Sequence, residues 1–323
     1  MRMLTMRSSS SCAAGCIFLA AIAWSLSAAA QFQERAEPKG PRLGEPVTQK
    51  WQLGLVVSAT NGPCTGLVGY VPLFVDWPEQ QVSVVAEDVT PNVRLTYQVV
   101  EGIKVMLVHI PQLPAGEEAK ALLTFEVRRC PILPPAKTDI YELPDPKRLP
   151  KDVRPYLAPS PGIESKAPKV RSLAREITGK HENAWKKVEA LYDWVRSHIK
   201  YEKGHAQGAL VALKTGKGNT DDLTSVFIAL CRAVDIPART VWIPGHCYPE
   251  FYLVDDEGKG HWFPCEMKEE RSFGGIAEQR PVLMKGDNFR PPYAPRDRQR
   301  LLTEYLTGTG GKPKHRFTRQ SVN

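Results

Sequence analysis

The sequence predicts an α+β protein in which a small all-β domain precedes a second domain of mixed helices and strands. Short runs of β-branched and apolar residues, separated by turn residues, fill positions 49–130. Prolines crowd positions 131–168, although proline is excluded from helix interiors and central strands. From position 169 onward, apolar residues recur at intervals of three and four, which is the spacing of an amphipathic helix.

The composition excludes several classes of protein. The 323-residue chain is 42% hydrophobic and 24% charged, which is typical of a globular protein and not of a disordered or fibrous one. Its net charge of +8 is a mild basic excess without interleaved basic and aromatic residues, so we expect no nucleic-acid partner.

The first 30 positions predict a secretory signal peptide. They combine two arginines, an apolar run and the small-residue motif Ala28-Ala29-Ala30. An uncleaved anchor is the alternative. No apolar stretch of membrane-spanning length follows, so we expect no membrane span after signal removal. The expected location is outside the cytoplasm, either secreted or in the periplasm or cell envelope.

Positions 31–48 are polar and contain Pro and Gly, which predicts a flexible leader. The β-rich runs that follow are 51–59, 67–75, 82–86, 93–100, 103–110 and 121–127. Six short strands with turns between them are typical of a β-sandwich, which we place at 49–130. Cys64 and Cys130 lie near its two ends, and in an oxidising compartment they form either a disulfide or two unpaired thiols.

The remaining chain divides into three parts. Positions 131–168 predict a stiff, extended connector, since proline-rich segments resist compaction. Positions 169–290 predict the α+β domain, with helices and strands at 184–200, 221–234, 240–243, 246–254 and 261–267. Positions 291–323 are basic and rich in Gly toward the end, so we expect a partly disordered tail.

Three segments of the α+β part carry a recognisable pattern. They read GNTDDLTSVFIALCRAVDIPAR at 218–239, HCYPEFYL at 246–253 and GHWFPCE at 260–266. In this order and spacing they resemble the transglutaminase-like superfamily, which has a papain-like fold built around a cysteine nucleophile. That family shows a Gly-x-Cys-x-Asp/Glu helix start, then Ile-Pro-Ala-Arg, then a His-x-x-x-Glu strand and a Trp-x-x-x-Asp strand.

The resemblance implies a role for individual residues. Thr220 falls at the position of the nucleophilic cysteine, His246 at the catalytic histidine and Glu266 at the acid that orients it. Four further residues are expected to support them: Asp222, Tyr248, Glu250 and Trp262. The chain thus keeps the histidine and the acid but lacks the cysteine.

That replacement changes the chemistry. A thiol has a pKa near ~8.5 and ionises readily beside a histidine, whereas an alcohol needs a stronger base and tighter geometry. Thr220 is also internal, so it cannot use a terminal amine as its base. One interpretation is that Asn219 or Thr220 only caps a helix, with Asp221 and Asp222 at its positive end. The other is that Thr220 acts as the nucleophile, with its backbone N–H near the oxyanion.

If His246 lies directly opposite Glu266 in an antiparallel pair, then Cys247 faces Cys265 on the reverse side. The two cysteines then form either a disulfide or packed thiols. We expect no metal site, because adjacent strand residues such as His246 and Cys247 point to opposite faces and His261 lies four residues from Cys265. We also expect no cofactor.

Three functions remain open. The preferred one is a catalytically inactive module that binds peptide or protein ligands or acts as a scaffold. The second is an active acyl-transfer or amide-hydrolysing enzyme that uses Thr220, His246 and Glu266. The third is a structural protein of the cell envelope.

Overall fold

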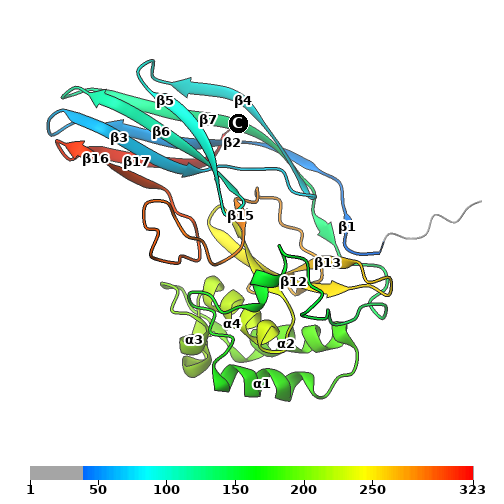
Figure 1. Cartoon of the computed structure of the whole chain (residues 1–323). Helices are drawn as coiled ribbons and strands as arrows, with labels where there is room; N and C mark the ends of the chain where they lie inside the picture. Colours follow the sequence, from blue (N-terminus) through cyan, green and yellow to red (C-terminus); the bar gives the residue numbers. More distant parts are fainter. Residues whose placement is uncertain (1–38, 323) are drawn as a thin grey trace, which may run out of the picture. The chain divides into compact units, whose positions relative to one another are not determined.

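The computed structural model describes residues 39–322 (Figure 1). The expected signal peptide at 1–30 and positions 31–38 of the expected leader lie outside this part. No helix among the described residues is long and apolar enough to cross a membrane. The predicted α+β class is confirmed: a β-sandwich and a mixed domain of four α-helices and a sheet make up the described chain.

The sandwich consists of two four-stranded antiparallel sheets, with strand orders β16-β3-β6-β5 and β17-β2-β7-β4. The strands are β2 Val47–Ser58, β3 Cys64–Pro72, β4 Gln80–Val89, β5 Arg94–Val100, β6 Ile103–Leu113, β7 Glu118–Arg129, β16 Tyr305–Gly310 and β17 Lys314–Val322. Alternating side chains of the two sheets meet in one core. Phe74, just after β3, belongs to this core and makes edge-to-face contacts with Trp51 and Phe125.

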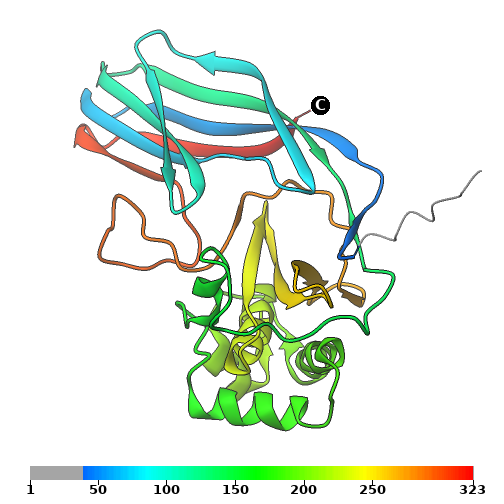
Figure 2. The ribbon, with the colours of Figure 1, turned by 45° about the vertical axis from the view of Figure 1, so that its right-hand side comes forward.

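The prediction of a disordered tail at 291–323 is wrong. Strand β16 pairs with β3 and β17 pairs with β2, so the end of the chain supplies one outer strand to each sheet (Figures 1 and 2). The polar composition of β17 reflects its place at a sheet edge, where most of its side chains face water. The partner strand lies at the other end of the sequence, so local composition does not reveal the pairing.

The prolines of 131–168 do not make a free spacer. Strand β8 (Ile132–Leu133) pairs with β1 (Arg42–Leu43), which also orders part of the expected leader. Beyond it, Tyr141 is buried in the helical core. The short 3-10 helix η1 (Arg154–Leu157) lies in the same segment. The prolines permit an extended path, while the apolar residues between them hold that path against the α+β domain.

The α+β domain places helices on one side of a five-stranded sheet with the order β14-β13-β12-β11-β15. Its helices are α1 Pro168–Thr178, α2 Ala184–His198, α3 Ala209–Thr215 and α4 Thr220–Ala233. Its sheet strands are β11 Ala238–Ile243, β12 His246–Val254, β13 Gly260–Glu266, β14 Ser272–Phe273 and β15 Met284–Lys285; β9 (Lys200–Tyr201) and β10 (Lys217–Gly218) form a separate parallel pair. The predicted helices at 184–200 and 221–234 and all three predicted strands are present, whereas α1 and α3 were not predicted.

Helix α4 is buried on almost every side and forms the centre of this domain. It ends as the sequence indicates, before Ile236-Pro237. Asp235 adopts a left-handed conformation with φ of 61°, and the N–H of Ile236 returns to the carbonyl of Cys231 at 3.0 Å. That bond satisfies a terminal carbonyl of the helix and turns the chain into β11.

The register of β12 and β13 differs from the expected one by two residues. Glu250 pairs with Pro264, and Tyr252 with Trp262, so His246 is not directly opposite Glu266 and Cys247 is not opposite Cys265. A shift of two residues keeps every side chain on the same face of the sheet, whereas a shift of one would reverse it. His246 and Glu266 therefore remain on one face.

All five cysteines among the described residues are free thiols. Neither the Cys64–Cys130 nor the Cys247–Cys265 disulfide is formed. Cys247 joins the apolar cluster of the sandwich, and Cys265 lies in the helical core, so the two belong to different packing units. Burial raises the pKa of both thiols well above the usual value, which makes them unreactive.

Candidate active site

The start of α4 is fixed by a reciprocal cap. The side chain of Asn219 accepts from the N–H of Asp222 at 2.9 Å, and the carboxylate of Asp222 accepts from the N–H of Asn219 at 3.0 Å. Asn219 is therefore the cap, and Thr220 occupies the first helical position. The hydroxyl of Thr220 therefore does not cap the helix.

Asp222 also connects the start of α4 to the loop before α3. Its second carboxylate oxygen accepts from the N–H groups of Gln207 at 2.6 Å and Gly208 at 2.8 Å, and the side chain is fully buried. It ties the loop before α3 to the start of α4. Its role is to position the segment that carries Thr220.

We expect Asp222→Ala to lower the free energy of unfolding by about 2–4 kcal/mol, because three partly or fully buried N–H groups lose their carboxyl acceptor. Urea denaturation followed by circular dichroism measures this loss. Asp139→Ala, which removes an exposed carboxylate, is the matched control. A loss no larger than in the control would contradict the structural role of Asp222.

His246 and Glu266 form the expected pair. Nε2 of His246 lies 3.0 Å from Oε2 of Glu266. The other carboxylate oxygen accepts from the backbone N–H groups of Lys268 at 2.8 Å and Glu269 at 3.3 Å. Burial alone would raise the pKa of Glu266, but the bond to His246 and these N–H groups outweigh it and lower the pKa. Glu266 is therefore an ionised group that fixes the imidazole ring.

Thr220 and His246 line one cleft of about 360 Å³. The walls are the start of α4, the turn between β11 and β12, the loop after β9, and part of the final segment of the chain. Because Nε2 of His246 is bound to Glu266, Nδ1 is the ring nitrogen left for chemistry. Among residues 39–322, neither that nitrogen nor the Thr220 hydroxyl has a hydrogen-bond partner.

The final segment of the chain contributes residues that the sequence analysis placed in a tail. Leu301 and Arg319 line the cleft, and Arg300 forms an ion pair with Asp221 beside Thr220. Burial raises the pKa of Asp221 and the neighbouring Asp222 adds to the effect, while Arg300 opposes it. No local motif marks these residues, since only the pairing of β16 and β17 with the sandwich brings them to the site.

Three predicted supporting residues lie outside the cleft. Tyr248 and Glu250 share the strand face of His246, as expected, but they contact charged residues between the two domains. Trp262 stacks under the guanidinium of Arg239, whose centre lies 4.0 Å from the ring centroid. These residues stabilise the sheet face next to the cleft and do not line it. Within the part of the chain that the structure describes, no cluster of three His, Cys, Asp or Glu side chains has metal-binding geometry.

Comparison with known proteins agrees with this geometry. The family model described as "Transglutaminase-like superfamily" matches residues 171–267, which contain α4, β12 and β13. A Haemophilus influenzae protein named "Uncharacterized protein" is 28% identical over 180 residues, which are 54% of this chain and 48% of that protein. The chain thus spans about half the length of this relative.

A solved structure from Cytophaga hutchinsonii, described as that of a "Putative Cysteine Protease", covers 88% of this chain and 93% of its own. The sequence identity is 18% and the TM-score is 0.59, so the similarity concerns the fold. It extends beyond the matched family domain and includes most of the sandwich. The family model thus identifies a transglutaminase-like domain at residues 171–267, which contain the His246–Glu266 pair on β12 and β13.

Proposed function

We propose that this protein is exported and binds peptide segments of other proteins in the cleft, without processing them. One observation carries the proposal: the His246–Glu266 pair lies in the same cleft as Thr220, the first residue of α4, which the family resemblance puts at the nucleophile position. The module would act as a binding or scaffold unit in the secreted, periplasmic or cell-envelope space. The signal-like positions 1–30 support export.

The physical argument against turnover concerns the nucleophile. A neutral imidazole at Nδ1 takes a proton from a thiol easily, because the two pKa values are close. The threonine hydroxyl is far less acidic, and its methyl group crowds the approach of a carbonyl carbon. The positive end of α4 and the backbone N–H of Thr220 still favour a carbonyl oxygen, which suits binding of an extended peptide.

The second candidate function is a threonine-dependent acyl transferase or amide hydrolase. It is favoured by the free hydroxyl of Thr220 and the free Nδ1 of His246 in the same cleft. In that reaction His246 takes the hydroxyl proton, the hydroxyl oxygen attacks the carbonyl carbon, and the leaving amine takes the proton from His246. Water or a second amine then releases the acyl group from Thr220.

An assay of the full chain beside Thr220→Cys separates these possibilities. We expect no peptide hydrolysis or amine incorporation by the wild type. We expect turnover by Thr220→Cys, because a thiolate forms readily beside His246. The introduced thiol should also react with iodoacetamide faster than the buried Cys247 and Cys265. Both properties should disappear in the double variant Thr220→Cys/His246→Ala.

Two outcomes would overturn the proposal. Wild-type turnover that is lost in both His246→Ala and Thr220→Ala would establish the threonine enzyme. Absence of turnover in every variant, with no binding of any member of a peptide library to the cleft, would favour a structural envelope protein.

A further inference from the structure

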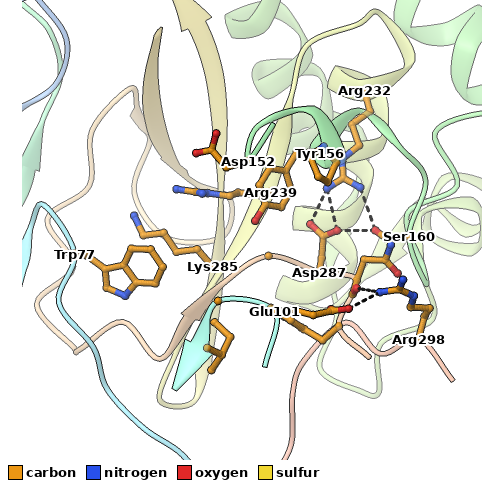
Figure 3. A pocket seen from close by; sticks show the side chains of 16 residues that line it. Trp77, Glu101, Asp152, Tyr156, Ser160, Arg232, Arg239, Lys285, Asp287 and Arg298 are labelled. Atoms are coloured by element: carbon orange, nitrogen blue, oxygen red, sulfur yellow. Dashed lines mark hydrogen bonds and ion pairs between the residues drawn. The ribbon is translucent and has the colours of Figure 1, made fainter. Parts of the chain in front are cut away.

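A second cavity, of about 600 Å³, lies apart from the cleft of Thr220 and His246 (Figure 3). Three parts of the chain form its walls: the sandwich, the segment around η1, and the end of the sheet in the transglutaminase-like domain. Its volume is that of a pocket for a small organic molecule. Apolar side chains of Ile103, Pro155 and Phe289 and the rings of Trp77 and Tyr156 line it.

The charged groups of this cavity fall into two sets. On one side Arg232 pairs with Asp287 and Arg298 pairs with Glu101, so both pairs are neutral (Figure 3). On the other side lie the cationic side chains of Arg239 and Lys285, with the exposed carboxylate of Asp152 beside Arg239 (Figure 3). The ammonium group of Lys285 lies over the ring of Trp77.

These two cations belong to a buried network with an excess positive charge. Lys285 lies 2.7 Å from carboxylate oxygens of both Glu79 and Glu250, and Arg239 lies 2.9 Å from Glu250. Glu79 also contacts Arg129 at 3.1 Å. Three cations thus share two carboxylates, which leaves a formal charge of +1.

Tyr248, which accepts a hydrogen bond from Arg129, does not balance this charge. Burial raises the pKa of its phenol well above the usual value, so the group stays neutral. A buried charge without a counterion is unfavourable, and an anion beside it is stabilised accordingly.

One hydrogen-bond donor of a residue that lines the cavity lacks an acceptor. The indole N–H of Trp77 is buried and has no hydrogen-bond partner within the described chain. An unmatched donor beside a net positive charge is expected at a site for an acceptor group that carries negative charge.

We infer that this cavity binds a small carboxylate joined to an apolar or aromatic group. The carboxylate lies beside Arg239 and Lys285, where it neutralises the network, and the apolar part contacts Trp77, Tyr156 and Ile103. The inference is independent of turnover at Thr220. A free aromatic acid and the C-terminal carboxylate of a peptide share this chemistry.

Isothermal titration of the full chain with three probes tests the inference. The probes are benzoate, N-acetylphenylalanine and the uncharged N-acetylphenylalaninamide. We expect at least one of the two carboxylates to bind about tenfold or more tightly than the amide, because only a carboxylate makes charge-assisted bonds there. Tighter binding of benzoate indicates a free acid as the natural ligand, and tighter binding of N-acetylphenylalanine indicates a peptide terminus.

Variants that keep every charged group of the buried network test the inference further. Asp152 lies exposed at the rim of the cavity without an ion-pair partner among residues 39–322. Asp152→Asn should therefore tighten carboxylate binding about threefold by removing a repulsion. Asp139→Asn, an exposed carboxylate that does not line the cavity, should leave binding unchanged. Trp77→Phe should weaken binding by removing the indole donor.

The inference is overturned if neither carboxylate binds, or if the amide binds as tightly as the acids. It is also overturned if carboxylate binding is equal in the wild type, Asp152→Asn and Trp77→Phe, because the ligand would then lie elsewhere.

Discussion

Replacing Asp287 with alanine is expected to lower the free energy of unfolding by about 3–5 kcal/mol. Both carboxylate oxygens of Asp287 accept from Nη2 of Arg232, at 2.9 and 2.8 Å, and each side chain is only 1% exposed. Asp287 also accepts from the hydroxyl of Ser160 at 2.7 Å and from the N–H of Thr240 at 3.2 Å. Its loss leaves the buried guanidinium of Arg232 without a counterion. It also removes the hydrogen bonds to Ser160 and Thr240.

Chemical denaturation of the purified chain gives the size of this effect. Asp256→Ala serves as the control, since Asp256 pairs with Lys39 at the surface and such pairs contribute about 0–1 kcal/mol. Asp287→Asn should be intermediate, because the amide keeps hydrogen-bond acceptors but removes the charge. Equal stabilities for the Asp287→Ala and Asp256→Ala variants would show that the buried pair does not contribute as described.

Replacing Glu79 with glutamine should be comparably destabilising near neutral pH, by about 3–5 kcal/mol. Glu79 comes from the sandwich and is the carboxylate that holds Arg129 and Lys285 between the domains. Burial opposes its ionisation, but Lys285 and Arg129 together lower its pKa from 4.5 to about 2. The neutral amide leaves the buried network with a larger excess of positive charge.

The lowered pKa also predicts a pH dependence with a definite sign. A carboxylate whose pKa is lower in the folded state stabilises the protein fully above its unfolded pKa of 4.5, and the contribution is lost as pH falls toward 2. The difference in unfolding free energy between wild type and Glu79→Gln should therefore shrink over this range. Denaturation at a series of pH values measures it, with the exposed Glu118→Gln as control. A difference that stays constant with pH would contradict the lowered pKa.

Local patterns predicted the elements that depend on neighbouring residues. The spacing of apolar residues placed α2 and α4, and Ile236-Pro237 placed the end of α4. Strand β12 begins and ends at the predicted residues. The short helix α3 escaped prediction because its seven residues span only two turns, too few to establish a period.

Pairings between distant segments could not be predicted in the same way. Strand β17 has the composition of a polar tail, and only its pairing with β2 makes it a strand. Arg319 of β17 and Leu301, which precedes β16, line the cleft as a result. Tyr248 and Glu250 were expected beside His246 because they share its strand face. Their partners, Arg129 and Lys285, were not visible in the sequence, and these partners hold them in the network between the domains.

The sequence by itself predicted the chemistry of the candidate site. Its resemblance to the transglutaminase-like superfamily put His246 and Glu266 at the positions of a catalytic pair and Thr220 at the position of the nucleophile, because side-chain identity and spacing are enough for such a prediction. The structure chose Asn219 over Thr220 as the cap, which is a local contact with Asp222. Only the tertiary structure decided that the end of the chain lines the cleft. It also decided that three cations share two carboxylates beside a second cavity. These features depend on contacts between residues far apart in the chain, whose positions are set by packing and not by local preference.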